Sequence, residues 1–189
     1  AMEAKVQQPF LAVSYSTPAA YQPGDRDLDV LANILGNGKS SRLYRRLVYD
    51  LKIAQSVSAG QQSQMLSSEF EIDASPMPGH TLDELLAVID EEIAKLQAAP
   101  VDDRELARAK NQIESDLVRS LEPLFARAEH LQRYNTYLND PGYLTEDLRQ
   151  YRAVTAEAVQ RAAQTYLRPS ARLIVTVEPN PQAPIMGRV

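Results

Sequence analysis

The stretch between residues 81 and 167 is filled by one helical pattern after another, and this succession most constrains the fold. Apolar residues recur there at helical spacing, and prolines, glycines or capping residues separate the patterns. Thr81 and Glu84 predict a capping box, Asp102 or Asp103 predicts a helix cap, and Pro123 fits a first-turn position. The predicted helices cover about 82–98, 103–121, 123–138, 144–151 and 156–167. Because these five helices follow each other without an intervening strand, strands and helices are segregated along the chain, which is typical of α+β folds.

Strand patterns lie on both sides of this helical stretch. They cover residues 9–16, 54–63, 68–75 and 171–177. The third pattern alternates strictly, so that Phe70, Ile72 and Ala74 point one way and three carboxylates point the other. A strand with one solvent-exposed face is more typical of an antiparallel sheet. We therefore predict an α+β fold in which an antiparallel-rich sheet has its helices packed on one side.

Residues 28–48 predict a helix, a glycine hinge and a second helix. Gly36 stands where a helix C-terminal glycine would stand, because glycine takes a positive φ there without penalty. Ser40 or Ser41 then offers a side-chain oxygen that can cap the second helix. The sequence therefore predicts two helices joined by a short, glycine-containing loop.

The same loop contains Gly38-Lys39-Ser40, which resembles the end of a phosphate-binding loop. That motif needs a further glycine five residues before Gly38 and a strand ahead of it. Asn33 occupies the glycine position, and the preceding segment is predicted to be helical. The sequence therefore does not favour a nucleotide-binding loop.

Length and composition limit the remaining possibilities. The 189 residues fit a single domain across 1–189, with a core of about 9–179 and a loose, proline-rich tail at 180–189. The net charge of −5 is spread along the chain, so no basic surface for nucleic acid is predicted. The absence of cysteine excludes disulfides and thiolate zinc sites. No apolar run reaches membrane-spanning length, and no secretory leader is recognisable.

No constellation of residues predicts catalysis or metal binding by this chain alone. His80 and His130 lie far apart, and neither has a companion at metal-ligand spacing. The segment 126–130 shares only its last two positions with the inverted zincin motif His-x-x-Glu-His. Its first position is Ala126, which has no donor atom, so this segment cannot provide the ligands that zinc needs. We therefore predict no catalytic and no metal-ligating residue.

Several segments, taken in order, resemble the M16 peptidases, which are inverted zincins of the pitrilysin and mitochondrial processing peptidase type. The segments are LDVLANILGNGKSSRLYRRLV, AQSVSAG, SEFEIDA, PGHTLDELLAVIDEEIAKL, DDRELARAKNQIESDLVRSLE and RAVTAEAVQRAAQTYLRPSARLIVTVEP. The resemblance covers about residues 9–179 and implies a domain of the LuxS/M16 metalloenzyme type. Such peptidases pair two similar α+β domains, of which one binds zinc and the other is metal-free. Because this chain lacks His-x-x-Glu-His, it resembles the metal-free, C-terminal domain.

The resemblance implies a function and a set of partners. The chain would be the non-catalytic C-terminal domain of a zinc metallopeptidase and would form the chamber wall opposite the zinc-bearing domain. It would hold no cofactor itself, and Zn²⁺ would lie in the N-terminal domain of the parent chain or in a partner subunit. Its partners would be that N-terminal domain, a second M16-like subunit or both, together with a peptide substrate. Bacterial relatives are often exported, which favours a periplasmic parent.

The resemblance also indicates where substrate would bind. The helix–glycine–helix segment is similar to the site of a glycine-rich substrate loop in processing peptidases. The matching residues here are Gly36, Asn37, Gly38, Lys39, Ser40 and Ser41. A peptide would add to a sheet edge by main-chain hydrogen bonds, and strand 68–75 is a candidate edge.

One departure from the family concerns the groups that grip substrate near the zinc. Many members carry an arginine and, seven residues later, a tyrosine, where this chain has Val48 and Gln55. Neither residue can stabilise a developing oxyanion as that pair does. We infer that a second subunit supplies the pair.

Two alternatives to the peptidase interpretation stay open. The chain could belong to a scaffold or assembly subunit of an inactive M16-like protein, and an upstream His-x-x-Glu-His motif in the parent would count against this. It could also be an unrelated helical interaction module, in which strands 9–16 and 171–177 would be unpaired.

Overall fold

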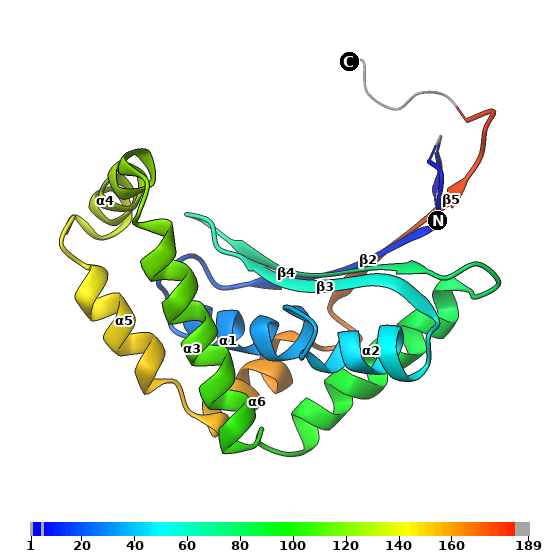
Figure 1. The fold of residues 1–189 in the computed structure, drawn as a ribbon, viewed down its shortest axis with the longest axis horizontal. Coiled ribbons are helices and arrows are strands. Elements are labelled where there is room, and N and C mark those ends of the chain that lie inside the picture. The colour runs from blue at the N-terminus through cyan, green and yellow to red at the C-terminus, as the bar shows by residue number, and fades with distance from the viewer. Residues whose placement is uncertain (1, 5, 184–189) are drawn as a thin grey trace.

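The computed structural model describes residues 2–4 and 6–183, and its described strands form one curved sheet (Figure 1). The strand order is β1-β5-β2-β4-β3. The pair β1–β5 is parallel and the other three pairs are antiparallel. The strands are β1 (Met2–Ala4), β2 (Phe10–Thr17), β3 (Ala54–Gln62), β4 (Ser68–Pro76) and β5 (Arg172–Pro179). The predicted antiparallel-rich sheet is thus confirmed, and the unrelated helical module is wrong because β2 pairs with β5.

The helices cover one side of this sheet and extend into an arm at one end (Figure 1). Helices α1 (Asp25–Gly36), α2 (Leu82–Ala98) and α6 (Ala156–Tyr166) pack against the strands. The arm contains α3 (Asp103–Ser120), α4 (Leu124–Leu138) and α5 (Leu144–Ala153). The predicted helices all form, although Pro123 caps α4 rather than entering its first turn. No described helix is long and apolar enough to cross a membrane.

The core lies between the sheet and the helix layer. The alternation predicted for β4 is confirmed, since Phe70, Ile72 and Ala74 are buried against α1 and α2. Helix α2 begins with the predicted capping box, in which the Glu84 amide donates to the Thr81 hydroxyl at 3.2 Å and the Thr81 amide donates to the Glu84 carboxylate at 2.8 Å. The alternation in β4 and the capping box of α2 could be predicted because the residues involved are close in sequence.

The hinge between residues 36 and 44 differs from its prediction. Gly36 is the last residue of α1 and does not have a positive φ, whereas Gly38 has φ +77°. Glycine is instead required at position 36 because α1 approaches β3 closely there. A Cβ atom at this position would lie 2.2 Å from the Ala59 amide nitrogen of β3. The Ser41 hydroxyl donates to the Gly38 carbonyl at 2.8 Å and does not cap the next helix. The predictions of a positive φ at Gly36 and of a serine cap are therefore wrong.

The second helix of the pair is η1 (Tyr44–Asp50), which is a π-helix. Its wider turn is visible where the Leu51 amide donates to the Arg46 carbonyl, five residues earlier, at 3.0 Å. Leu43 and Leu47 are fully buried and join this helix to the core. π-Helices are rare and short, and the sequence pattern gave no signal that distinguishes η1 from an α-helix.

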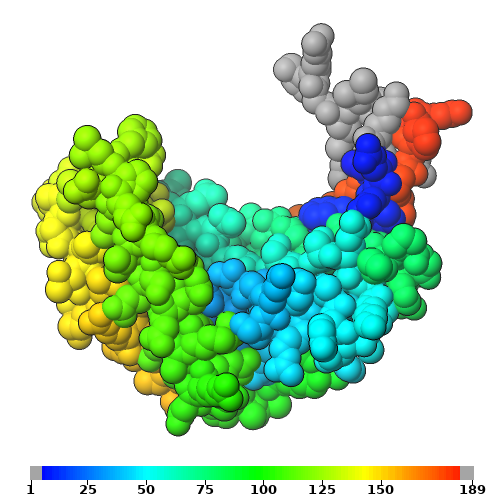
Figure 2. All heavy atoms as spheres, viewed as in Figure 1, coloured from blue at the N-terminus to red at the C-terminus, as the bar shows by residue number. Residues whose placement is uncertain are grey.

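The other face of the sheet is left uncovered, and the molecule is hollowed there (Figure 2). The hollow lies between the arm that carries α4 and the end of the sheet formed by β1 and β5 (Figures 1 and 2). Of the predicted loose tail, residues 180–183 form a turn in which the Ala183 amide donates to the Asn180 carbonyl at 3.1 Å. Residues 184–189 lie outside the described part of the chain.

Candidate functional site

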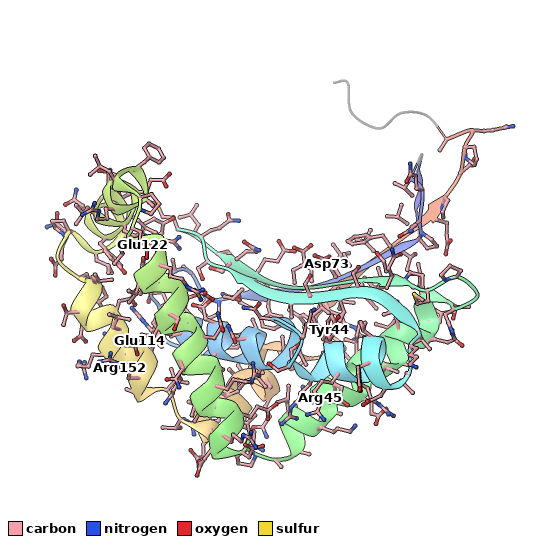
Figure 3. The ribbon with its side chains drawn as sticks, viewed as in Figure 1. Tyr44, Arg45, Asp73, Glu114, Glu122 and Arg152 are labelled. Atoms are coloured by element: carbon pink, nitrogen blue, oxygen red, sulfur yellow. The ribbon has the colours of Figure 1, made fainter. Side chains whose placement is uncertain are left out.

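Three carboxylates stand on the uncovered face of the sheet. Glu69, Glu71 and Asp73 alternate along β4 with its buried residues, so they point away from the helices. Asp73 lies on the hollowed side of the sheet (Figure 3). Their register partners on β2 are Ser16, Ser14 and Ala12, and on β3 they are Gln62, Gly60 and Ser58. Because these partners are uncharged, the neighbouring strands do not neutralise the row.

Burial and mutual repulsion act on these carboxylates. Desolvation raises the pKa of Glu71, and the charges of Asp73 and Glu69 raise it further. Desolvation likewise raises the pKa of Asp73, with a contribution from Glu69. The Ser14 hydroxyl donates a hydrogen bond to Glu69. Successive members of the row are about 7 Å apart along the strand, and no group of three potential ligands in the described chain could hold a metal ion.

The predicted substrate loop lies in the helix layer and not on this face. Of its six residues, Gly36 and Ser41 are buried, and the other four are exposed. Tyr44 and Arg45, which follow the loop, lie on the opposite side of the sheet from Asp73 (Figure 3). The approach of Gly36 to Ala59 nevertheless places the start of the loop directly beside strand β3.

Strand β4 is not an edge of the sheet, because β2 and β3 flank it. The proposal that a peptide adds to residues 68–75 is therefore wrong, since both sides of that strand are already paired. The edges among the described strands are β1 and β3. Strand β3 is polar, and its Gln55, Ser56 and Ser58 are exposed. The loop thus begins beside an edge strand whose exposed residues are polar.

The remaining candidate residues do not meet at one place. Val48 packs against the core, while Gln55 is exposed on β3. The imidazole of His80 lies 3.3 Å from the Glu84 carboxylate, and that of His130 lies 2.8 Å from the Ser120 hydroxyl. Each histidine thus has a local partner within its own helical region, and the two do not form a shared site.

Comparison with known proteins assigns the family. The model of the peptidase M16 inactive domain matches residues 2–113. The chain belongs to the peptidase M16 inactive domain family. This assignment confirms the resemblance that the ordered sequence segments indicated. No curated protein matches the sequence.

Solved structures share the fold of this M16 inactive domain. A protease from Helicobacter pylori is 25% identical with a TM-score of 0.84, and the match covers 92% of this chain and 42% of that one. A candidate zinc protease from Bordetella pertussis is 27% identical with a TM-score of 0.80, over 93% and 96% of the two chains. The inactive peptidase domain of a candidate zinc protease from Bordetella parapertussis is 27% identical with a TM-score of 0.80, over 89% and 91%. The M16 inactive domain thus spans less than half of the Helicobacter protein.

The sequence did not reveal a buried polar network that joins α1 of this M16 inactive domain to the arm. Arg26 pairs with Asp147 at 2.7 Å, and their side chains are only 10% and 8% exposed. The Tyr134 hydroxyl donates to Asp147 at 3.0 Å, and the Tyr151 hydroxyl donates to Asp29 at 2.6 Å. The network fixes the arm, and hence one wall of the hollow, to the helix layer.

Asp29 makes the stability of the M16 inactive domain depend on pH. The pKa of Asp29 is raised to about 7, mainly by desolvation; the hydrogen bond from Tyr151 opposes the rise, and the charges of Asp25 and Asp147 contribute to it. An acid whose pKa is raised by folding loses stability as pH rises from about 4 to about 7. We expect Asp29→Asn to stabilise the domain by about 2 kcal/mol at pH 8 and to flatten its pH dependence between 5 and 7.

Thermal unfolding from pH 5 to pH 8 would measure this effect. The matched control is Glu122→Gln, because Glu122 is exposed and its carboxylate has no ion pair within the described chain (Figure 3). Equal pH profiles for wild type and Asp29→Asn would contradict the assignment of the titration to Asp29.

Proposed function

We propose that this domain forms the wall of a peptide chamber in a longer M16 zinc metallopeptidase, opposite an N-terminal domain that binds zinc. The observation that carries the proposal is the hollowed face of the sheet, which the helices leave uncovered (Figure 2). The family is that of a peptidase domain that is itself inactive, which fits a role in shaping a chamber. The similar Helicobacter pylori protease, of which this chain spans 42%, supports a longer parent. In this arrangement the uncovered face of the sheet lines the chamber.

The peptide adds to the free edge of β3 by main-chain hydrogen bonds. We propose β3 and not strand 68–75, because that strand, β4, is paired on both sides. The exposed loop residues Asn37, Gly38, Lys39 and Ser40 follow Gly36, which abuts Ala59 of β3. The loop therefore contributes to substrate binding from beside the β3 edge, and not from the uncovered sheet face that lines the chamber.

Zinc does not fit the residues of this domain. Ala126 stands at the first position of the inverted motif, and the two histidines are engaged in separate contacts. Zinc sites need at least three converging protein ligands. The domain's contribution is then shape and docking surface, while an N-terminal domain or a second subunit provides zinc and the missing arginine–tyrosine pair.

The first test concerns the isolated domain. We expect the purified chain to bind zinc well below one ion per chain and to cleave no peptide, because its described residues include no converging set of ligands. Metal analysis after dialysis and digestion of unfolded casein would measure both. Stoichiometric zinc together with cleavage that chelators abolish would overturn the proposal.

A second test places photo-crosslinking residues in the full-length parent, with an inactivated zinc motif and a labelled peptide. We expect a crosslink from position 58 on the β3 edge and none from position 157, which is also exposed but lies in α6 on the helix side. Crosslinks from both positions, or only from position 157, would contradict the chamber-wall arrangement.

The alternative function is that of a scaffold or assembly subunit in an inactive M16-like protein. The replacement of the arginine–tyrosine pair by Val48 and Gln55 favours it. A parent without any His-x-x-Glu-His motif, combined with no peptide crosslink at position 58, would select this alternative.

A further inference from the structure

Five arginines line one groove on the helix side of the domain. The groove has a volume of about 620 Å³ and lies between η1, α2 and the start of α3. Arg45 is directed to this side, away from the uncovered sheet face (Figure 3). The arginines are Arg42, Arg45, Arg46, Arg104 and Arg108. Such a concentration is unexpected in a chain whose net charge is −5.

The carboxylates that also line the groove are mostly engaged in other contacts. Glu105 accepts two hydrogen bonds from Arg42, at 2.9 and 2.7 Å. Glu92 pairs with Lys95 at 2.8 Å, and Asp102 caps α3 by accepting from the Glu105 amide at 2.8 Å. Among the lining carboxylates, only Asp50 forms no side-chain hydrogen bond or ion pair within the described chain.

The other four arginines of the groove have few acceptors. Arg46 has a single ion pair, at 3.9 Å to Glu91, and its buried Nε has no hydrogen-bond partner. Nη2 of Arg108 is also buried and unpartnered. Neither Arg45 nor Arg104 forms an ion pair with any described residue. Arg46 and Arg108 thus each hold a buried nitrogen without an acceptor, which is unfavourable, and an anion in the groove would supply the missing acceptors. Arg45 and Arg104 are exposed to solvent.

We propose that this arginine groove binds a compact polyanion that carries several phosphate groups. Guanidinium forks match phosphate oxygens in pairs and remain charged at all physiological pH values. The volume falls within the range of small-molecule sites. The lining contains no aromatic or aliphatic side chain, so it offers no platform for a nucleobase, and a polyphosphate without a base fits better than a nucleotide.

Ser40 also lines the groove and adds a hydroxyl donor. It belongs to the Gly38-Lys39-Ser40 segment, but the site is not a phosphate-binding loop, because helix α1 precedes it and Lys39 does not line the groove. Since the groove and the uncovered sheet face lie on opposite sides of the sheet, polyanion binding is independent of the proposed chamber function.

Isothermal titration of the purified domain with tripolyphosphate, at constant ionic strength, tests this inference. We expect specific binding that is about tenfold weaker in Arg45→Gln and in Arg104→Gln, and weaker again in the double variant. Arg127→Gln is the matched control, because Arg127 is an exposed arginine of α4 outside the groove. It should change the affinity less than about twofold.

Both groove variants replace exposed side chains, so the folded state should persist, and circular dichroism would verify this. Absence of binding at millimolar tripolyphosphate would overturn the proposal, as would equal weakening in Arg127→Gln. Tighter binding of hexaglutamate than of tripolyphosphate would also overturn it and would assign the groove to an acidic protein segment.

Discussion

Replacing Gly36 with alanine is expected to destabilise the domain by about 3 kcal/mol, even though alanine is the better helix former. The new Cβ atom would lie 2.2 Å from the Ala59 amide nitrogen and 2.8 Å from its Cα. These are backbone atoms of β3, so no flexible side chain can move aside. Relief of the clash requires a shift of α1 or of β3, and each of these shifts disturbs the core below the sheet.

Gly38→Ala provides the control for this prediction. Gly38 has φ +77°, but a Cβ atom there would meet nothing within 4 Å. The Gly38→Ala variant should therefore lose only about 1 kcal/mol of stability, because alanine is held there in the left-handed backbone conformation. Urea unfolding of the two variants should therefore show a clear difference in midpoint. If the two midpoints fell equally, the close approach of Gly36 to β3 would not be the reason for glycine at that position.

Replacing Asp147 with alanine should cost about 3–5 kcal/mol, because it leaves the buried Arg26 guanidinium without its counter-ion. Arg26 also lies over the rings of Tyr21 and Tyr151, at 5.4 and 5.7 Å from their centroids, so it cannot easily turn toward water. The Tyr134 hydroxyl loses its acceptor in the same variant. Denaturant unfolding at pH 7 measures the loss.

Two further variants make this prediction specific. Glu146→Ala removes the neighbouring carboxylate, whose pair with Arg149 is exposed to solvent, and should leave the midpoint almost unchanged. Adding Arg26→Met to Asp147→Leu removes both buried charges and should recover part of the stability. A double variant less stable than Asp147→Leu alone would show that the buried charge is not the source of the loss.

The sequence predicted those features that depend on neighbouring residues. The alternation in β4, the capping box at Thr81 and the cap at Asp102 each involve residues within a few positions of one another. Because the contacts that stabilise these features are local, the sequence pattern alone is sufficient to predict them. The fold class followed from the order of these elements.

Features that depend on distant contacts could not be predicted in this way. The need for glycine at position 36 comes from Ala59, and the partner of Arg26 is Asp147, in another helix. The interior position of β4 follows from the strand order, which no single segment encodes. The arginine groove was missed for the same reason, since its arginines lie in and just before η1 and in α3, which are far apart in the sequence.

Strand β5 occupies an interior position in the sheet although it is the last strand of the described chain. It lies between β1 and β2, and Val175 is paired with Ala12. During synthesis β2 must therefore keep one side open until β5 leaves the ribosome, which takes on the order of ten seconds. A nascent or truncated chain that ends before residue 172 will leave one edge of β2 unpaired, and chaperone binding or aggregation should be strongest in that interval.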